Sequence, residues 1–316
     1  MVQIETTRGE RTPEQQSFQQ RFQQSLWQVP NRGFIFDYQL VGRRDNLQIN
    51  VPGYSDWFTG LMQIVREKCL AEQVCDHSQP HVEQAAQNGL VFLDMVHDAL
   101  PNTLDAHLFS DSAVVFTLLV HDIGYGSPDV RWENQYAIGH EEAGSRMITR
   151  FIETLPENSS QRQFLAPLLP SIVHAMSTDT DSREDIMATV FSAKHAASPE
   201  AIFSLLIMTA DKVDYFRSGR IDAIPAPNTY AENPYYFLAW MVENYELVYD
   251  KEAKKIHYVV HLYGEDKLSF EDRQERLALW QKEIRTHFPY VLELLEGMAY
   301  LTGTQLVIEP GQEKSV

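Results

Sequence analysis

The residues best suited to chemistry in this sequence are His121 and Asp122, which lie side by side at the end of an apolar run. Seven of the eight residues from 113 to 120 are apolar, so a helix here has no hydrophilic face and is expected inside a core. Burying an imidazole and a carboxylate without partners costs on the order of several kcal/mol. A divalent cation would satisfy both groups, and the negative end of the helix dipole favours a cation there. A hydrogen bond between the two side chains is the alternative that this pair alone leaves open.

Four further residues of metal-binding type lie on segments whose apolar spacing predicts inward-facing helices. They are His81, His140, His174 and Asp211. Asp211 closely follows the apolar run from 202 to 208, which begins behind Ser198-Pro199-Glu200, a typical helix start. A buried carboxylate at that position also requires a partner. Mixed imidazole and carboxylate ligands suit hard or borderline divalent metals, which can assist reactions of phosphate groups.

The order and setting of these residues resemble the HD superfamily of metal-dependent phosphohydrolases. The family pattern has a histidine on one helix, a His-Asp pair at the end of the next, and an aspartate after alanine on a later helix. This sequence has His81, then Val120-His121-Asp122-Ile123-Gly124, then Thr209-Ala210-Asp211-Lys212. Two further histidines in between, which are His140 and His174 here, distinguish the members that bind two metals. The resemblance covers about residues 76 to 222.

The resemblance implies a centre of two divalent ions, with Mn, Fe, Mg, Co or Ni as candidates. The implied metal ligands are His81, His121, Asp122, His140, His174 and Asp211. Adjacent helical residues point about 100° apart, so His121 can bind one ion while Asp122 bridges to the other. His81 and Asp211 would complete the first site, and His140 and His174 would build the second.

The implied function is hydrolysis of a phosphate ester or anhydride in a nucleotide or a similar small molecule, with a metal-bridging hydroxide as nucleophile. His121 and Asp122 would position this hydroxide as catalytic residues. Candidate phosphate contacts are Lys212, Arg217 and Arg220. We also group Lys212 with the catalytic residues. Tyr125 is expected in the substrate site because it takes the place of a lysine that touches the phosphate in many relatives. The motifs of the branches that hydrolyse guanosine tetraphosphate or cyclic di-GMP are not found, so those substrates are not expected.

Two other functions fit the same ligands. Some HD-fold proteins with a similar ligand set are di-iron oxygenases, and a non-catalytic nucleotide-sensing module would bind its ligand without cleaving it. Coloured protein that consumes O₂ would favour the oxygenase, whereas phosphate release stimulated by Mn²⁺ from colourless protein would favour the hydrolase. A complete set of six ligands argues against the sensor, because binding alone does not need them.

A second His-Asp pair, His97-Asp98, is expected to lie outside the site. It follows His81 by sixteen residues on one predicted helix, which is about 24 Å at 1.5 Å per residue and too far to share a metal. The remaining histidines are expected to be surface or packing residues: His77, His107, His195, His257, His261 and His287.

The chain of 316 residues carries 44 acidic and 26 basic side chains, which gives a net charge of −18. This balance argues against nucleic acid as a partner, but it allows a small phosphorylated substrate if metals supply positive charge. The two cysteines, Cys69 and Cys75, are too few for a disulfide framework. We find no apolar signal-peptide core, and the apolar runs are shorter than the roughly 20 residues of a membrane span. We therefore expect a cytoplasmic protein without a membrane partner, and leave a homodimer open.

The expected fold is mainly α-helical, an HD-type helical bundle with small α/β additions at both ends. The expected domains are residues 1–75 as an N-terminal extension with a β-hairpin and a helix, 76–222 as the metal-binding domain, and 223–316 as a C-terminal α+β extension. Residues 127–137 are expected to form a polar loop. In the C-terminal part the patterns predict a helix over 235–248, a strand over 256–263, a returning strand over 267–270, a long helix over 271–300 and a strand over 305–308.

Overall fold

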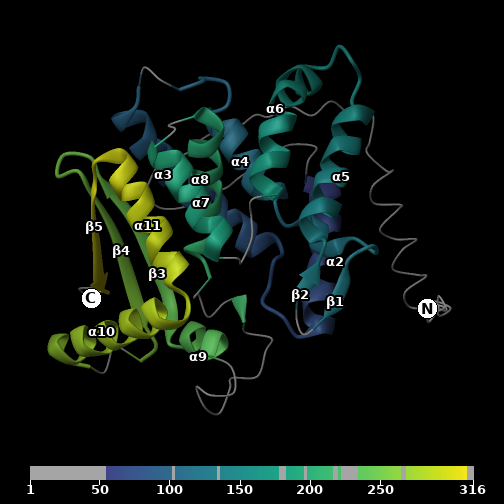
Figure 1. Cartoon of the computed structure of the whole chain (residues 1–316). Helices are drawn as coiled ribbons and strands as arrows, with labels where there is room; N and C mark the ends of the chain where they lie inside the picture. Colours follow the sequence, from purple (N-terminus) through teal and green to yellow (C-terminus); the bar gives the residue numbers. More distant parts are fainter. Residues whose placement is uncertain are drawn as a thin grey trace, which may run out of the picture.

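The computed structural model describes residues 55–101, 104–133, 136–177, 183–195, 198–215, 220–221, 234–264 and 268–311. This part of the chain is mainly helical and carries two small β-sheets, so the predicted fold class is confirmed (Figure 1). The hairpin predicted over residues 34–51 lies outside the described residues. No helix in the described ranges is long and apolar enough to cross a membrane.

The helices follow the predicted apolar repeats closely through the first two thirds of the described chain. They are α2 (Ser55–Glu72), α3 (Gln79–Ala99), α4 (Asp111–Val120), α5 (His140–Thr154), α6 (Ser160–Ser177), α7 (Arg183–His195) and α8 (Pro199–Lys212). The apolar spacing in the sequence did not indicate α7. A short 3₁₀ helix, η1 (Ile123–Gly126), follows α4, and the segment expected to be a loop contains a small hairpin of β1 (Arg131–Glu133) and β2 (Tyr136–Ile138).

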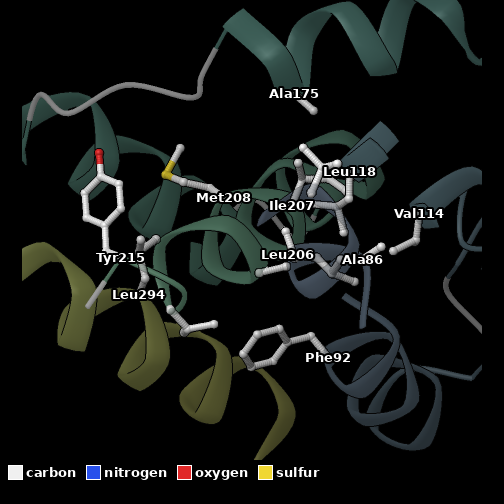
Figure 2. Close-up of a cluster of buried hydrophobic side chains, with 14 of the residues drawn as sticks. Ala86, Phe92, Val114, Leu118, Ala175, Leu206, Ile207, Met208, Tyr215 and Leu294 are labelled. Atoms are coloured by element: carbon white, nitrogen blue, oxygen red, sulfur yellow. The ribbon is translucent and has the colours of Figure 1, made fainter. Parts of the chain in front are cut away.

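Helix α4 lies in the middle of the core, as its apolar sequence predicts. All its residues from Ala113 to Val120 are buried, and the Ser110 side chain accepts a hydrogen bond from the Ala113 N–H to cap its start. Gly89 of α3 allows a close approach, because a Cβ there would lie 2.3 Å from the Leu118 Cδ1 atom. Figure 2 shows side chains from α3, α4, α8 and the later helix α11 (Pro289–Thr302) converging here, including Ala86, Leu118 and Leu294.

The C-terminal part adds a three-stranded sheet that lies beside the helices (Figure 1). Its strands are β3 (Val242–Asp250), β4 (Lys255–Leu262) and β5 (Gln305–Pro310), in the order β3-β4-β5. The β3–β4 pair is antiparallel and the β4–β5 pair is parallel. The chain returns from β4 to β5 through α10 (Phe270–His287) and α11 (Pro289–Thr302), which allows the parallel pairing.

Three predictions for the C-terminal part are wrong. The helix predicted over 235–248 is the short helix α9 (Pro234–Trp240) followed by strand β3. The long helix predicted over 271–300 is two helices, because Pro289 has no N–H to continue α10 and starts α11 instead. The strand predicted to return beside β4 does not do so: Phe270 begins α10, and the neighbours of β4 are β3 and β5.

One cluster of buried apolar side chains extends from Leu61 of α2 to Ala299 of α11. It includes Tyr245 and Tyr258 of the C-terminal sheet and Leu118 of the central helix α4. The described residues of all three predicted domains therefore share one core, and the division at residues 75 and 222 stays a prediction.

Candidate metal centre

Four of the predicted metal ligands lie together in the core. They are His81, His121, Asp122 and Asp211, and each offers a ligand atom within 4.8 Å of those of the other three. The Nε2 atom of His81 lies 2.8 Å from Asp211 Oδ1 and 3.3 Å from Asp122 Oδ2. The Nε2 atom of His121 lies 3.4 Å and 3.2 Å from the same two oxygens. A site of two imidazoles and two carboxylates, all buried, could hold a divalent metal.

The end of α4 places two of these ligands. The helix ends at Val120, His121 keeps helical dihedral angles, and Asp122 turns the chain into η1 at φ −97° and ψ 4°. Gly124 then allows η1 to touch the start of α5, since a Cβ there would lie 1.8 Å from the His140 carbonyl oxygen. The change from α4 to η1 leaves Asp122 facing His81 of α3 and His121 facing Asp211 of α8.

The two imidazoles are oriented so that one nitrogen of each faces the cluster. His121 donates its Nδ1–H to the Leu118 carbonyl at 2.7 Å, and His81 donates its Nδ1–H to Asp214 Oδ2 at 2.8 Å. These partners occupy Nδ1 and leave Nε2 of each ring as the nitrogen that can bind a metal. Both Nε2 atoms are buried and make no hydrogen bond of acceptable geometry to any described residue. Two imidazole nitrogens and two carboxylate oxygens then face one another, an arrangement that a cation among them would stabilise.

The pKa values of the candidate ligands are shifted by their neighbours' charges, and these shifts determine whether protons or a cation balance the carboxylates. Burial favours the neutral imidazole of His121, but the charge of Asp122 outweighs it and raises the pKa of His121 well above its ordinary value. Burial likewise opposes ionisation of Asp122, yet His121 and His77 hold its pKa well below the usual range. Without a metal, protons on the imidazoles therefore balance the carboxylates, and a bound ion has to displace them.

Lys212 orients Asp211. Its Nζ lies 2.9 Å from Asp211 Oδ2, so the other carboxylate oxygen, Oδ1, is the one that faces the histidines. Burial works against ionisation of Asp211, but Lys212 and the two histidines lower its pKa well below the usual range. Lys212 is itself buried, and its Nζ lies 4.8 Å from the centre of the Tyr215 ring. Lys212, which was predicted to contact phosphate, thus contacts the candidate metal ligand Asp211.

His77 belongs to the site, although the sequence analysis expected a surface or packing residue. It is 7% exposed, and its Nδ1 lies 2.7 Å from Asp122 Oδ2. Its Nε2 lies 3.1 Å from the Sγ atom of Cys75, and its ring stacks on Tyr125 at 3.9 Å. Burial lowers the pKa of His77, but Cys75 and Asp122 outweigh this effect and raise it to about 10. The available clue was its position four residues before His81, next to the start of α3.

Two predicted ligands lie outside the group of four. His140 begins α5, donates its Nδ1–H to the Ala137 carbonyl at 2.7 Å and has its ring 4.2 Å from that of Tyr125. His174 is exposed near the end of α6. The predicted substrate residue Tyr125 thus has His77 and His140 as ring neighbours, one turn from the ligands.

The remaining predicted residues divide into one at the edge of the site, one outside the described residues and the excluded pair. Arg220 is buried, and its Nη2 lies 3.2 Å from His77 Nδ1 while its Nε–H donates to the Asp76 carbonyl. Arg217 lies outside the described residues. His97 donates to the Phe109 carbonyl and Asp98 pairs with Lys251, so this pair has other partners, as expected for residues away from the site.

Comparisons with protein-family models, curated proteins and solved structures gave no match. The residue pattern and the geometry of this centre are therefore the basis for assigning a function.

Proposed function

We propose that this protein is a metal-dependent phosphohydrolase that cleaves a phosphate ester or anhydride of a nucleotide or a similar small phosphorylated molecule. The observation that supports this proposal most directly is the group of His81, His121, Asp122 and Asp211, with two imidazole Nε2 atoms buried and directed at two carboxylates. A divalent metal held there would supply Lewis acidity and an activated water for attack on phosphorus. The order of the ligands along the chain adds the resemblance to the HD superfamily.

The residues around the group fit an anionic substrate. Lys212 contacts Asp211, and Arg220 contacts His77, which in turn contacts Asp122. Lys212 therefore contacts a candidate ligand directly, and Arg220 is linked to one through His77. These cations lie near the centre although the net charge of the protein is −18. In the proposed enzyme these two positive charges attract the phosphate and balance its charge, and Tyr125 lines the substrate site.

The number of ions is part of the proposal. The group of four supports one ion. The resemblance adds a second, bridged by Asp122 and held by His140 and His174, and this second ion stays a prediction. Metal analysis of protein loaded with Mn²⁺ would distinguish the two: two ions per chain support the dinuclear centre, and a single ion assigns His140 and His174 to other roles.

The test of function combines metal loading with two activity measurements. Purified protein is loaded separately with Mn²⁺, Fe²⁺, Mg²⁺, Co²⁺ and Ni²⁺ and assayed for phosphate release from a panel of nucleotides and sugar phosphates, and for O₂ uptake. Phosphate release that requires the metal and disappears in His121→Ala supports the proposal. Uptake of O₂ by a coloured iron form would replace it with the oxygenase, and tight nucleotide binding without turnover would replace it with the sensor.

A further inference from the structure

The second nitrogen of His81 connects the metal centre to the C-terminal sheet. His81 Nδ1–H donates to Asp214 Oδ2 at 2.8 Å, and the hydroxyl of Tyr245 on β3 donates to the other oxygen, Asp214 Oδ1, at 3.0 Å. Asn88 of α3 donates its Nδ2–H to the Tyr245 hydroxyl at 2.8 Å and to the Ala210 carbonyl at 2.9 Å. The chain of contacts thus runs from a residue of the sheet, through a carboxylate, to a candidate metal ligand.

All four side chains in this series of hydrogen bonds are buried. Asp214 and His81 are 0% exposed, Asn88 is 2% exposed and Tyr245 is 4% exposed. Donors to both oxygens hold a buried carboxylate in one orientation. Here His81 and Tyr245 contact different oxygens of Asp214, so the tyrosine hydroxyl sets the rotation of the carboxylate that His81 faces.

We infer that Tyr245 is a positioning residue for the metal centre, and that the C-terminal sheet sets the metal affinity of His81 through Asp214. Asp214 keeps the proton on Nδ1 of His81, which keeps the Nε2 lone pair directed at the cluster and makes it a better donor. Loss of the tyrosine hydroxyl would remove one donor to Asp214 and loosen this arrangement without removing any ligand. The inference rests on the proposed metal centre and gives the C-terminal extension a role in it.

The adjacent strand provides a matched control. Tyr258 of β4 is also fully buried, and its ring lies 5.4 Å from that of Tyr245. Its hydroxyl donates to the Val213 carbonyl at 3.1 Å instead of to Asp214. Tyr245→Phe and Tyr258→Phe therefore each remove one buried, hydrogen-bonded hydroxyl from the same sheet, but only the first removes the hydrogen bond to Asp214 Oδ1.

The experiment measures the binding of Co²⁺ to the full chain by competition with a chelator, together with the visible absorption of the bound ion and urea unfolding without metal. Loss of an outer hydrogen-bond partner of a metal ligand lowers affinity by about 10- to 100-fold. We expect such a loss in Tyr245→Phe, with an altered Co²⁺ spectrum, and a change of less than about threefold in Tyr258→Phe. Asp214→Asn should lose at least as much affinity as Tyr245→Phe.

A double variant tests whether Tyr245 acts through Asp214. In the Asp214→Asn background, Tyr245→Phe should cause little further loss of Co²⁺ affinity, because the intermediate contact is already broken. Additive losses would overturn the inference. It would also be overturned if Tyr245→Phe and Tyr258→Phe bound Co²⁺ equally well, while wild-type protein that binds no Co²⁺ would overturn the proposed function itself.

Hydrogen exchange gives a second readout that does not depend on activity. Coupling between the metal and Tyr245 has to be reciprocal, so Co²⁺ should slow amide exchange in β3 around Tyr245 in the wild type. The same protection should be smaller in Tyr245→Phe and intact in Tyr258→Phe. Equal protection of β3 in all three proteins would contradict the coupling.

Discussion

Asp122 is the residue whose change should separate metal binding from folding most clearly. Its Oδ2 atom lies 2.7 Å from His77 Nδ1, 3.2 Å from His121 Nε2 and 3.3 Å from His81 Nε2. Asp122→Asn keeps the size of the side chain but removes the negative charge at the point where these three rings meet. The change therefore acts on the charge of the centre and leaves the packing of α4 almost unchanged.

The size of the effect follows from the burial of this charge. Removing one partner from a buried charge pair costs about 3–5 kcal/mol. Since about 1.4 kcal/mol corresponds to a factor of ten in Kd, the Kd for Mn²⁺ should rise by roughly two to three and a half orders of magnitude. Chelator competition measures this change, and circular dichroism in the absence of metal should show a helical signal close to that of the wild type.

The matched control is Asp98→Asn, the same substitution in the other His-Asp pair. The Asp98 side chain is 26% exposed and pairs with Lys251, so its loss should change the Kd for Mn²⁺ by less than about threefold. An Asp122→Asn protein that binds Mn²⁺ within tenfold of the wild type would refute the reasoning. So would an Asp98→Asn protein that loses as much affinity as Asp122→Asn.

Three further predictions concern packing, protons and thiols. Gly124→Ala would place a Cβ 1.8 Å from the His140 carbonyl oxygen, so it should lower the free energy of unfolding in urea by about 3 kcal/mol. The control Gly303→Ala, where φ is +62° and no atom lies within 4 Å, should lower it by only about 1 kcal/mol. Equal losses would contradict the close contact at Gly124. The pKa of His121 is raised, so below that pKa metal binding must displace a proton, and affinity for Mn²⁺ should rise by about tenfold per pH unit for each proton displaced, from pH 6 to 8; calorimetry that shows no pH dependence would contradict this sign. Cys75 is partly exposed with its Sγ 3.1 Å from His77 Nε2, while burial raises the pKa of Cys69, so iodoacetamide should modify Cys75 at least about tenfold faster, as peptide mass spectrometry would show.

The sequence predicted the central helices and their ligands because the apolar repeat and the burial problem coincide there. The run before His121 could only be a core helix, and the polar pair at its end required a partner. His77 was missed because it precedes α3, where no helical repeat indicates the direction of a side chain. Its contact with Asp122 depends on the path of the chain before the helix, which sequence spacing does not determine.

The error over residues 235–248 has a specific physical cause. Strands β3 and β4 shift register between Val242 and Asn244, and this irregularity leaves Val242 and Tyr245 both buried although they are three residues apart. A spacing of three is the pattern of a helix, so the irregularity made a strand look helical. The break at Pro289 could have been predicted, because proline disfavours helix continuation. The prediction of one helix followed the apolar pattern on both sides of Pro289 and overlooked the proline.

The burial of the ligands also decides how fast an ion can enter or leave the centre. The side chains of His81, His121, Asp122 and Asp211 are each at most 5% exposed. In the proposed enzyme, exchange of an ion requires local opening of the chain around these ligands, so its rate depends on the free energy of that opening as well as on the affinity of the site. Changes in metal supply would then reach folded protein only at the rate of this opening.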